Sequence, residues 1–247
     1  MSRHVEILRR ARLEDGPFGF PAEPADPDRA PASAASPAPR PIGPNSQDHW
    51  RQLTRELLLH QRLDPPYGIG LASATAGEGT SYAAQHLAAE LARSERPTLL
   101  LEANLQRPSL AERLGVDPEP GLARLLRDEG LETTDCLRQT AVENLWLLPA
   151  GPDGAGADWG LFRQIHSALR QRFSAIVVDL PPVHLSPDFL ILGPHLEGLI
   201  LVVQADLCSR EVIQNAVTRL RRANANVIGT ILNRRKFFIP GPIYRRL

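Results

Sequence analysis

The stretch YGIGLASATAGEGTSYAA, residues 67–84, decides the fold class. Its first eight residues form a continuous run of small and apolar side chains, which is typical of a strand buried on both faces. The residues from Thr80 to Arg93 predict a helix, and the turn between strand and helix contains Gly77 and Gly79. Such a turn can point backbone N–H groups at a phosphate, and a phosphate-binding loop normally continues with a lysine and a hydroxyl residue. Here Ser81 supplies the hydroxyl, but Thr80 stands where the lysine belongs.

The rest of the chain repeats this alternation of buried strands and helices. Further strands are predicted at 97–103, 144–150, 174–180, 198–205 and 226–232, and helices at 46–63, within 109–128, at 159–172 and at 210–223. Continuous apolar strands that alternate with helices imply a parallel sheet covered on both faces. We therefore expect an α/β protein with three layers. Its ligands should bind at the carboxyl ends of the strands, where the loops 74–81, 102–108 and 179–187 meet.

Composition sets the expected domain boundaries. Residues 1–14 read as a short basic amphipathic helix, and residues 15–45 are rich in proline and alanine, so we expect a disordered linker there. The folded domain should span residues 46–235, and a basic tail should follow over 236–247. Formal charge is balanced, which gives no indication of a nucleic-acid partner, and two distant cysteines suit a reducing cytoplasm.

Four motifs occur in one order along the chain. They are SATAGEGTSY (73–82), EANLQRP (102–108), DLPP (179–182) and LNR (232–234). In this order they resemble the bacterial tyrosine kinases of polysaccharide export, the BY-kinases, which belong to the P-loop branch of the MinD and ParA ATPases. The resemblance covers about residues 46–235 and implies a P-loop NTPase-like fold. Glycine-rich turns between a strand and a helix are also common as purely structural features, so the loop alone does not establish nucleotide binding.

The departures from the family pattern fall on the chemistry. Thr80 replaces the lysine that would hold phosphate oxygens, and Tyr82 replaces a threonine. Glu102 and Asn104 replace two aspartates, and an asparagine cannot act as a general base. Asp179 keeps its acid, although an acid at a strand end can also cap neighbouring backbone amides. We expect that the shape is kept and phosphoryl transfer is lost.

The resemblance also implies which residues would form each site. The nucleotide-binding residues would be Gly77, Glu78, Gly79, Thr80, Ser81 and Asn233; Ser81 and Asp179 would hold Mg²⁺; Asp179 and Glu102 would be catalytic if the site were active. Any ATP or ADP binding should be weak. The three tyrosines of the chain include Tyr244 as the single one in the tail, whereas the family carries a tyrosine cluster there.

Partners are implied in the same way. The helix DHWRQLTREL (48–57) resembles the family's ring-forming element through Trp50, Arg51 and Leu53. We expect a cytoplasmic pseudokinase or scaffold of exopolysaccharide or capsule biosynthesis. It would dock on a membrane chain-length (co-polymerase) protein, on an active BY-kinase or on copies of itself, and its basic tail could hold the anionic inner face of the membrane. An active kinase or ATPase with an unorthodox site, and a MinD/ParA-type positioning ATPase, remain the alternatives.

Overall fold

The computed structural model describes residues 44–234, with the exception of residues 62, 95, 129, 153, 155 and 156. The expected N-terminal helix, most of the linker and the basic tail lie outside the described residues. The helices are α1 (Pro44–Gln61), α2 (Thr80–Ala92), α3 (Leu110–Leu114), α4 (Leu122–Leu125), α5 (Phe162–Arg170), α6 (Phe189–Leu192) and α7 (Arg210–Arg222). Short 3-10 turns lie at Thr133–Cys136, Trp159–Leu161 and Gly193–His195. The strands are β1 (Tyr67–Ser73), β2 (Thr98–Glu102), β3 (Arg138–Gln139), β4 (Leu145–Leu148), β5 (Ala175–Asp179), β6 (Gly198–Gln204) and β7 (Val227–Asn233).

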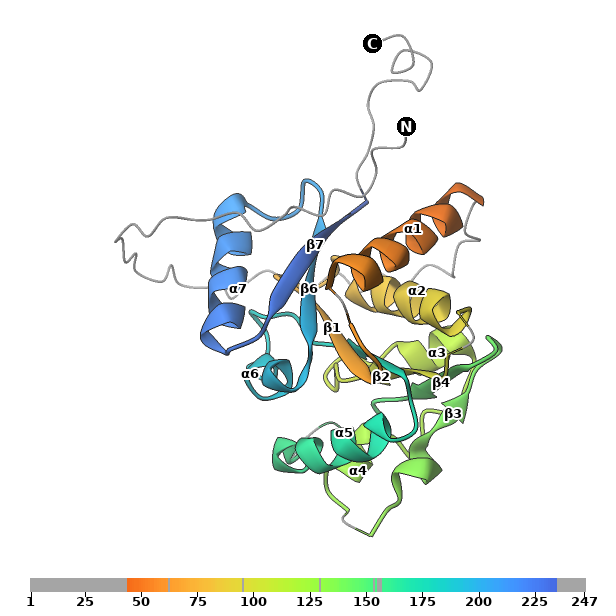
Figure 1. Ribbon diagram of the computed structural model, residues 1–247. Helices are drawn as coiled ribbons and strands as arrows, with labels where there is room; N and C mark the ends of the chain where they lie inside the picture. Colours follow the sequence, from red (N-terminus) through yellow and green to blue (C-terminus); the bar gives the residue numbers. More distant parts are fainter. Residues whose placement is uncertain are drawn as a thin grey trace.

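The strands form one seven-stranded sheet in the order β3-β4-β2-β5-β1-β6-β7. Every neighbouring pair is parallel except β3 with β4. Successive side chains of a strand enter opposite faces: Leu99 and Leu101 pack in one apolar core, and Leu100 packs in the other. One face carries α1, α2 and α3, and the other carries α4 to α7 (Figure 1). The three-layer α/β fold is therefore confirmed.

The observed elements differ from the expected ones in two details. Helix α1 begins at Pro44, two residues before the expected start at residue 46. A proline fits the first turn of a helix because its missing N–H would have no partner there. The second miss is β3, whose two residues Arg138 and Gln139 pair with Leu147 and Trp146 in antiparallel fashion. A two-residue polar strand leaves no periodic pattern in the sequence.

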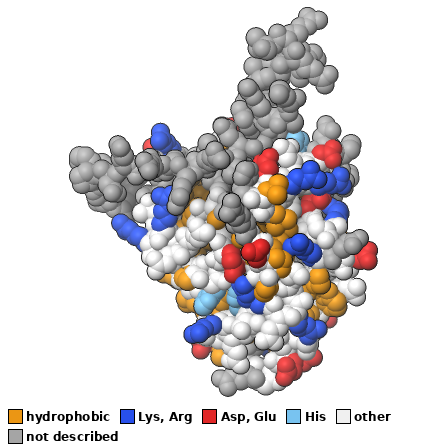
Figure 2. Space-filling view, viewed as in Figure 1, with side chains coloured by type: hydrophobic (Ala, Val, Ile, Leu, Met, Phe, Trp, Pro, Cys, Tyr) orange, Lys and Arg blue, Asp and Glu red, His pale blue; other side chains and the backbone are white. Residues whose placement is uncertain are grey.

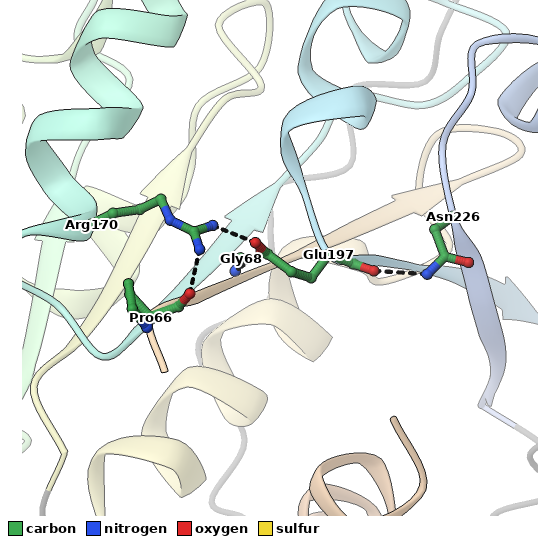
Figure 3. A network of polar contacts seen from close by, with 5 residues as sticks. All are labelled: Pro66, Gly68, Arg170, Glu197 and Asn226. Atoms are coloured by element: carbon green, nitrogen blue, oxygen red, sulfur yellow. Dashed lines mark hydrogen bonds and ion pairs between the residues drawn. The ribbon is translucent and has the colours of Figure 1, made fainter. Parts of the chain in front are cut away.

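A polar network closes the sheet at its amino edge, the end opposite the predicted ligand loops (Figure 3). The Glu197 carboxylate accepts the Gly68 N–H at 2.5 Å and pairs with Arg170, which also donates to the Pro66 carbonyl. The Asn226 side chain donates to the Glu197 carbonyl at 2.8 Å. These contacts join β1, α5, β6 and the start of β7. The network therefore stabilises the strand register at the amino edge, and the candidate site lies at the opposite, carboxyl edge.

The arginines at the C-terminal end of α7 are separated from the carboxyl edge. Helix α7 runs antiparallel to β7 (Figure 1), so its last residues, Arg221 and Arg222, lie near the start of β7, while Arg234 follows its end. The seven residues of β7, at about 3.3 Å each, make the separation about 23 Å. On the face shown in Figure 2, the described Lys/Arg side chains are interspersed with acidic ones. Among the described residues, no helix has the length and apolarity needed to cross a membrane.

Candidate functional site

The loop between β1 and α2 turns on two glycines. Gly77 and Gly79 have φ angles of +86° and +93°, which residues other than glycine rarely adopt. At Gly79 a Cβ atom would also lie 2.2 Å from Nδ2 of Asn233, so a larger residue would displace the Asn233 side chain. The loop leads directly into the N-terminus of the 13-residue helix α2, which begins at Thr80. Loop amides and a helix N-terminus are the two elements that favour an anion at this position.

Glu78 holds the loop from below. Its Oε1 accepts hydrogen bonds from the Thr75 N–H at 2.7 Å and from the Thr75 hydroxyl at 2.9 Å, and its Oε2 accepts the Gln204 N–H at 3.0 Å. The Cys208 sulfur lies 3.4 Å from the same Oε1. The carboxylate is fully buried, so it joins the loop to the end of β6. Only the backbone of Glu78 is left to face a nucleotide.

The end of β7 is fastened to the same loop. Asn233 Nδ2 donates to the Glu78 carbonyl at 2.8 Å. Arg234, the next residue, donates from Nη1 to the Gln204 side-chain oxygen at 2.9 Å and to the Gly77 carbonyl at 3.4 Å. The structure thus brings Asn233 to the loop, as the motif order predicts. Arg234 at the loop was missed as a site residue, although the LNR motif placed it beside Asn233.

Glu102 has a structural task. Its Oε1 accepts the backbone N–H groups of Ser109 and Leu110 at 2.5 and 2.7 Å, and its Oε2 accepts that of Ala150 at 3.1 Å. The side chain is 1% exposed. Because both oxygens are taken by backbone donors, the carboxylate caps the start of α3 and ties β2 to the segment after β4. These three hydrogen bonds leave the carboxylate little capacity to act as a base or to bind a metal ion.

Asp179, at the end of β5, differs from Glu102 because its buried carboxylate has no backbone donors. It is 1% exposed, and neither carboxylate oxygen has a hydrogen-bond partner of normal geometry. Burial raises the pKa of Asp179 from 3.8 to about 7, and the repulsion of Glu102 adds to this. The nearby Ser81 hydroxyl and the more distant Arg113 lower the pKa in part. A buried carboxylate without partners is costly unless something compensates it, so the geometry fits a bound cation.

Ser81 and Asp179 are better suited to Mg²⁺ than to a metal ion whose ligands all come from the protein. Among the described residues, no three His, Cys, Asp or Glu side chains gather into a metal site. Mg²⁺ usually takes one or two protein oxygens and completes its shell with water and substrate phosphates. Ser81 and Asp179 would supply those oxygens, and the metal would neutralise charge between Asp179 and a phosphate.

The residues expected to mediate assembly pack largely within the domain. The Trp50 ring stacks on His86 at 5.5 Å and meets Tyr82 edge-on at 6.4 Å, while Leu53, also on α1, is buried. Burial and nearby arginines lower the pKa of His86 to about 4, so it is neutral in this cluster. Arg51 is exposed and lies 3.8 Å from Glu90. The role of the three residues in assembly stays a prediction, but the Leu53 side chain is already used in the core.

Fold and site together define a P-loop NTPase-like domain: a parallel sheet, a glycine loop leading into a helix, and an acid at the end of the adjacent strand. No protein-family model matches the chain. Its relatives nevertheless include proteins named as bacterial tyrosine-protein kinases, and its fold matches the kinase domains of BY-kinases. It is 24% identical over 191 residues to the tyrosine-protein kinase CapB of Staphylococcus aureus, which covers 76% of this chain and 83% of CapB. It is 29% identical over 176 residues to the succinoglycan biosynthesis transport protein ExoP of Rhizobium meliloti.

Solved structures agree with this assignment. The kinase domain of VpsO superimposes with a TM-score of 0.68 at 29% identity, over 78% of this chain and 96% of that domain. MinD of Pyrococcus horikoshii, solved with Mg-ADP, superimposes with a TM-score of 0.61 at 22% identity, over 73% of this chain and 76% of MinD, which shows the shared fold. The sequence match to ExoP, by contrast, covers 67% of this chain but only 22% of the length of ExoP. It likewise covers 22% of the tyrosine-protein kinase ptk of Acinetobacter johnsonii.

Proposed function

We propose that this protein is a BY-kinase homologue that does not transfer phosphoryl groups and that acts as a scaffold in capsule or exopolysaccharide biosynthesis. The observation that carries the proposal is that the Glu102 carboxylate is engaged in backbone hydrogen bonds. Where the family has an aspartate, this carboxylate is consumed by three backbone N–H groups. Together with Thr80 at the lysine position, this removes two of the charged groups that phosphoryl transfer needs.

The remaining groups support binding without transfer. The loop amides, Ser81 and the unpartnered Asp179 provide an anion cradle and a cation site. A lost charge-assisted hydrogen bond from lysine weakens binding by about 1.5–3 kcal/mol, or roughly 10- to 150-fold. We therefore propose weak binding of ATP or ADP with Mg²⁺.

The two alternative functions are less well supported. An active kinase with an unorthodox site would rely on Glu102, Asp179 and an arginine, and the Glu102 carboxylate already accepts three backbone N–H groups. A MinD/ParA-type positioning ATPase would need the same lysine that Thr80 replaces. The fold is common to both classes, so it does not separate them.

The relatives support the proposed setting. ExoP is by name a transport protein of succinoglycan biosynthesis, and CapB and CpsD are named tyrosine-protein kinases. By analogy, the partner would be a membrane co-polymerase at the cytoplasmic face, joined by an active BY-kinase or by further copies of this chain. Helix α1 presents Arg51 toward solvent as the most accessible of the three assembly candidates.

The variant Thr80→Lys tests the proposal. It restores the charge at the start of α2 but leaves the Glu102 carboxylate bound to backbone N–H groups. ATP affinity should therefore rise at least about tenfold, while tyrosine phosphorylation stays absent. Affinity is measured by calorimetry with Mg²⁺, and phosphorylation with a tyrosine-rich peptide as acceptor. Thr80→Met serves as the control with a side chain of similar length and no charge. Phosphotyrosine formation by the wild-type protein contradicts the proposal, and unchanged affinity in Thr80→Lys shows that the loop does not hold phosphate.

A further inference from the structure

Arg234 occupies an unusual position at the mouth of the loop. Its φ of +54° lies in the left-handed region, which turns the chain directly after β7. Asn233 is fixed to the Glu78 carbonyl, so the backbone that precedes Arg234 is anchored. The guanidinium then reaches the Gly77 carbonyl and the Gln204 amide oxygen through the same atom, Nη1. An exposed arginine that follows β7 therefore contacts the phosphate-binding loop across 157 positions of the chain.

The charges around Arg234 show why a cation at this position matters. The acids at the loop are Glu78, which is buried under it, and Asp179 beside it, while Thr80 leaves the helix start without a cation. The single lysine of the chain, Lys236, lies outside the described residues. Arg113, on α3, lowers the pKa of Asp179 through its charge, but no hydrogen bond joins it to the loop among the described residues. Among the described residues, Arg234 is the cation whose side chain contacts the loop itself.

The two contacts of Arg234 also differ in strength. The contact to Gln204, at 2.9 Å, is a normal hydrogen bond, whereas the contact to the Gly77 carbonyl, at 3.4 Å, is long. Both acceptors are neutral, and a guanidinium forms shorter and stronger bonds with phosphate oxygens, often through two nitrogens at once. A phosphate in the loop would therefore replace a weak contact of Arg234 by a charge-assisted one at little cost.

We propose that Arg234 supplies the positive charge that the loop lacks at Thr80, and that it binds the phosphates of a nucleoside di- or triphosphate. This inference rests on the proposed nucleotide binding and adds the residue responsible for it. Because the guanidinium enters from the end of β7 and not from the start of α2, it replaces the lysine in binding without reproducing its position. The device retains a nucleotide where phosphoryl transfer is lost.

The test compares affinities for Mg-ADP and Mg-ATP in the full chain. Arg234→Gln should weaken both at least tenfold and should flatten the decrease of affinity with added salt, which a merely structural role would not change. Arg221→Gln, on α7 at the amino edge, is the matched control and should bind within twofold of wild type. In the double variant with Thr80→Lys, the lysine should recover most of the affinity that Arg234→Gln loses. Thermal melts confirm that each variant is folded.

The other outcomes overturn the inference in distinguishable ways. If Arg234→Gln binds both nucleotides as wild type does, Arg234 is not the phosphate contact, although nucleotide binding stands. If Arg107→Gln or Arg113→Gln causes the loss instead, the charge comes from the segment around α3. If the wild-type protein binds neither nucleotide, the inference fails while the scaffold proposal, which is judged by phosphoryl transfer in a separate assay, survives.

Discussion

Asp179→Asn gives the sharpest test of how the site is built. The carboxylate is buried without a hydrogen-bond partner, and its pKa is raised from 3.8 to about 7. Between these values the folded protein keeps a proton that the unfolded chain releases, so the contribution of Asp179 to stability is complete below about pH 4 and is lost as the pH rises to about 7. The difference of about 3 pH units, at 1.36 kcal/mol for each, amounts to about 4 kcal/mol.

The asparagine variant does not titrate and keeps nearly the same size. Its buried amide costs about 1–3 kcal/mol at every pH, because it too lacks a partner. Relative to wild type, the unfolding free energy of Asp179→Asn should therefore rise by about 4 kcal/mol between pH 4 and pH 8. Urea unfolding at four pH values, in buffer without divalent ions, measures this difference directly.

Magnesium provides the complementary arm of the same experiment. With Mg²⁺ and ADP at pH 8, the wild-type protein should gain stability because the ionised carboxylate acquires a cation, and Asp179→Asn should gain much less. A stability difference that stays constant with pH, or one that moves in the opposite direction, would refute the reasoning. The opposite direction would mean that Asp179 accepts hydrogen bonds from nearby amides and has a lowered pKa.

Three further substitutions have expected outcomes. Glu102→Ala leaves three buried N–H groups without an acceptor and should lower the unfolding free energy by at least about 3 kcal/mol in urea titrations, whereas a loss below 1 kcal/mol would mean that water replaces the carboxylate. Gly79→Ala should cost about 1–3 kcal/mol because of its φ of +93° and its contact with the end of β7, and an unchanged melting temperature would contradict this. Trp50→Ala should lower the melting temperature, because the ring is stacked within the domain. A smaller species with an unchanged melt would instead place Trp50 in an assembly interface.

Much of the fold could be predicted from local patterns. The segment 67–84 contains a strand, a turn and a helix in one unbroken run, and the structure reproduces its boundaries within a residue. Apolar runs predict β2, β5 and β6 because strands buried on both faces leave a continuous signal. Strand β3 and helix α6, of two and four residues, are too short to leave one.

The roles of the site residues were less accessible, because they depend on partners far away in sequence. Glu102 keeps the charge of an aspartate, but its neighbour Ala150 lies 48 positions further on, so its structural task is invisible until the chain folds. The contact of Arg234 with Gly77 spans 157 positions. A single unmatched residue such as Thr80, in contrast, could be recognised at once because a motif fixes what belongs there.

Phosphoryl transfer itself tests the account most directly. The wild-type protein is incubated with radiolabelled ATP, Mg²⁺ and a tyrosine-rich acceptor peptide, and both phosphotyrosine and released phosphate are measured against a protein-free blank. We predict no labelled tyrosine and no ATP hydrolysis above the blank, even at ATP concentrations at which binding is saturated. Labelled tyrosine that disappears in Asp179→Ala would contradict the account and show that this site is an active kinase.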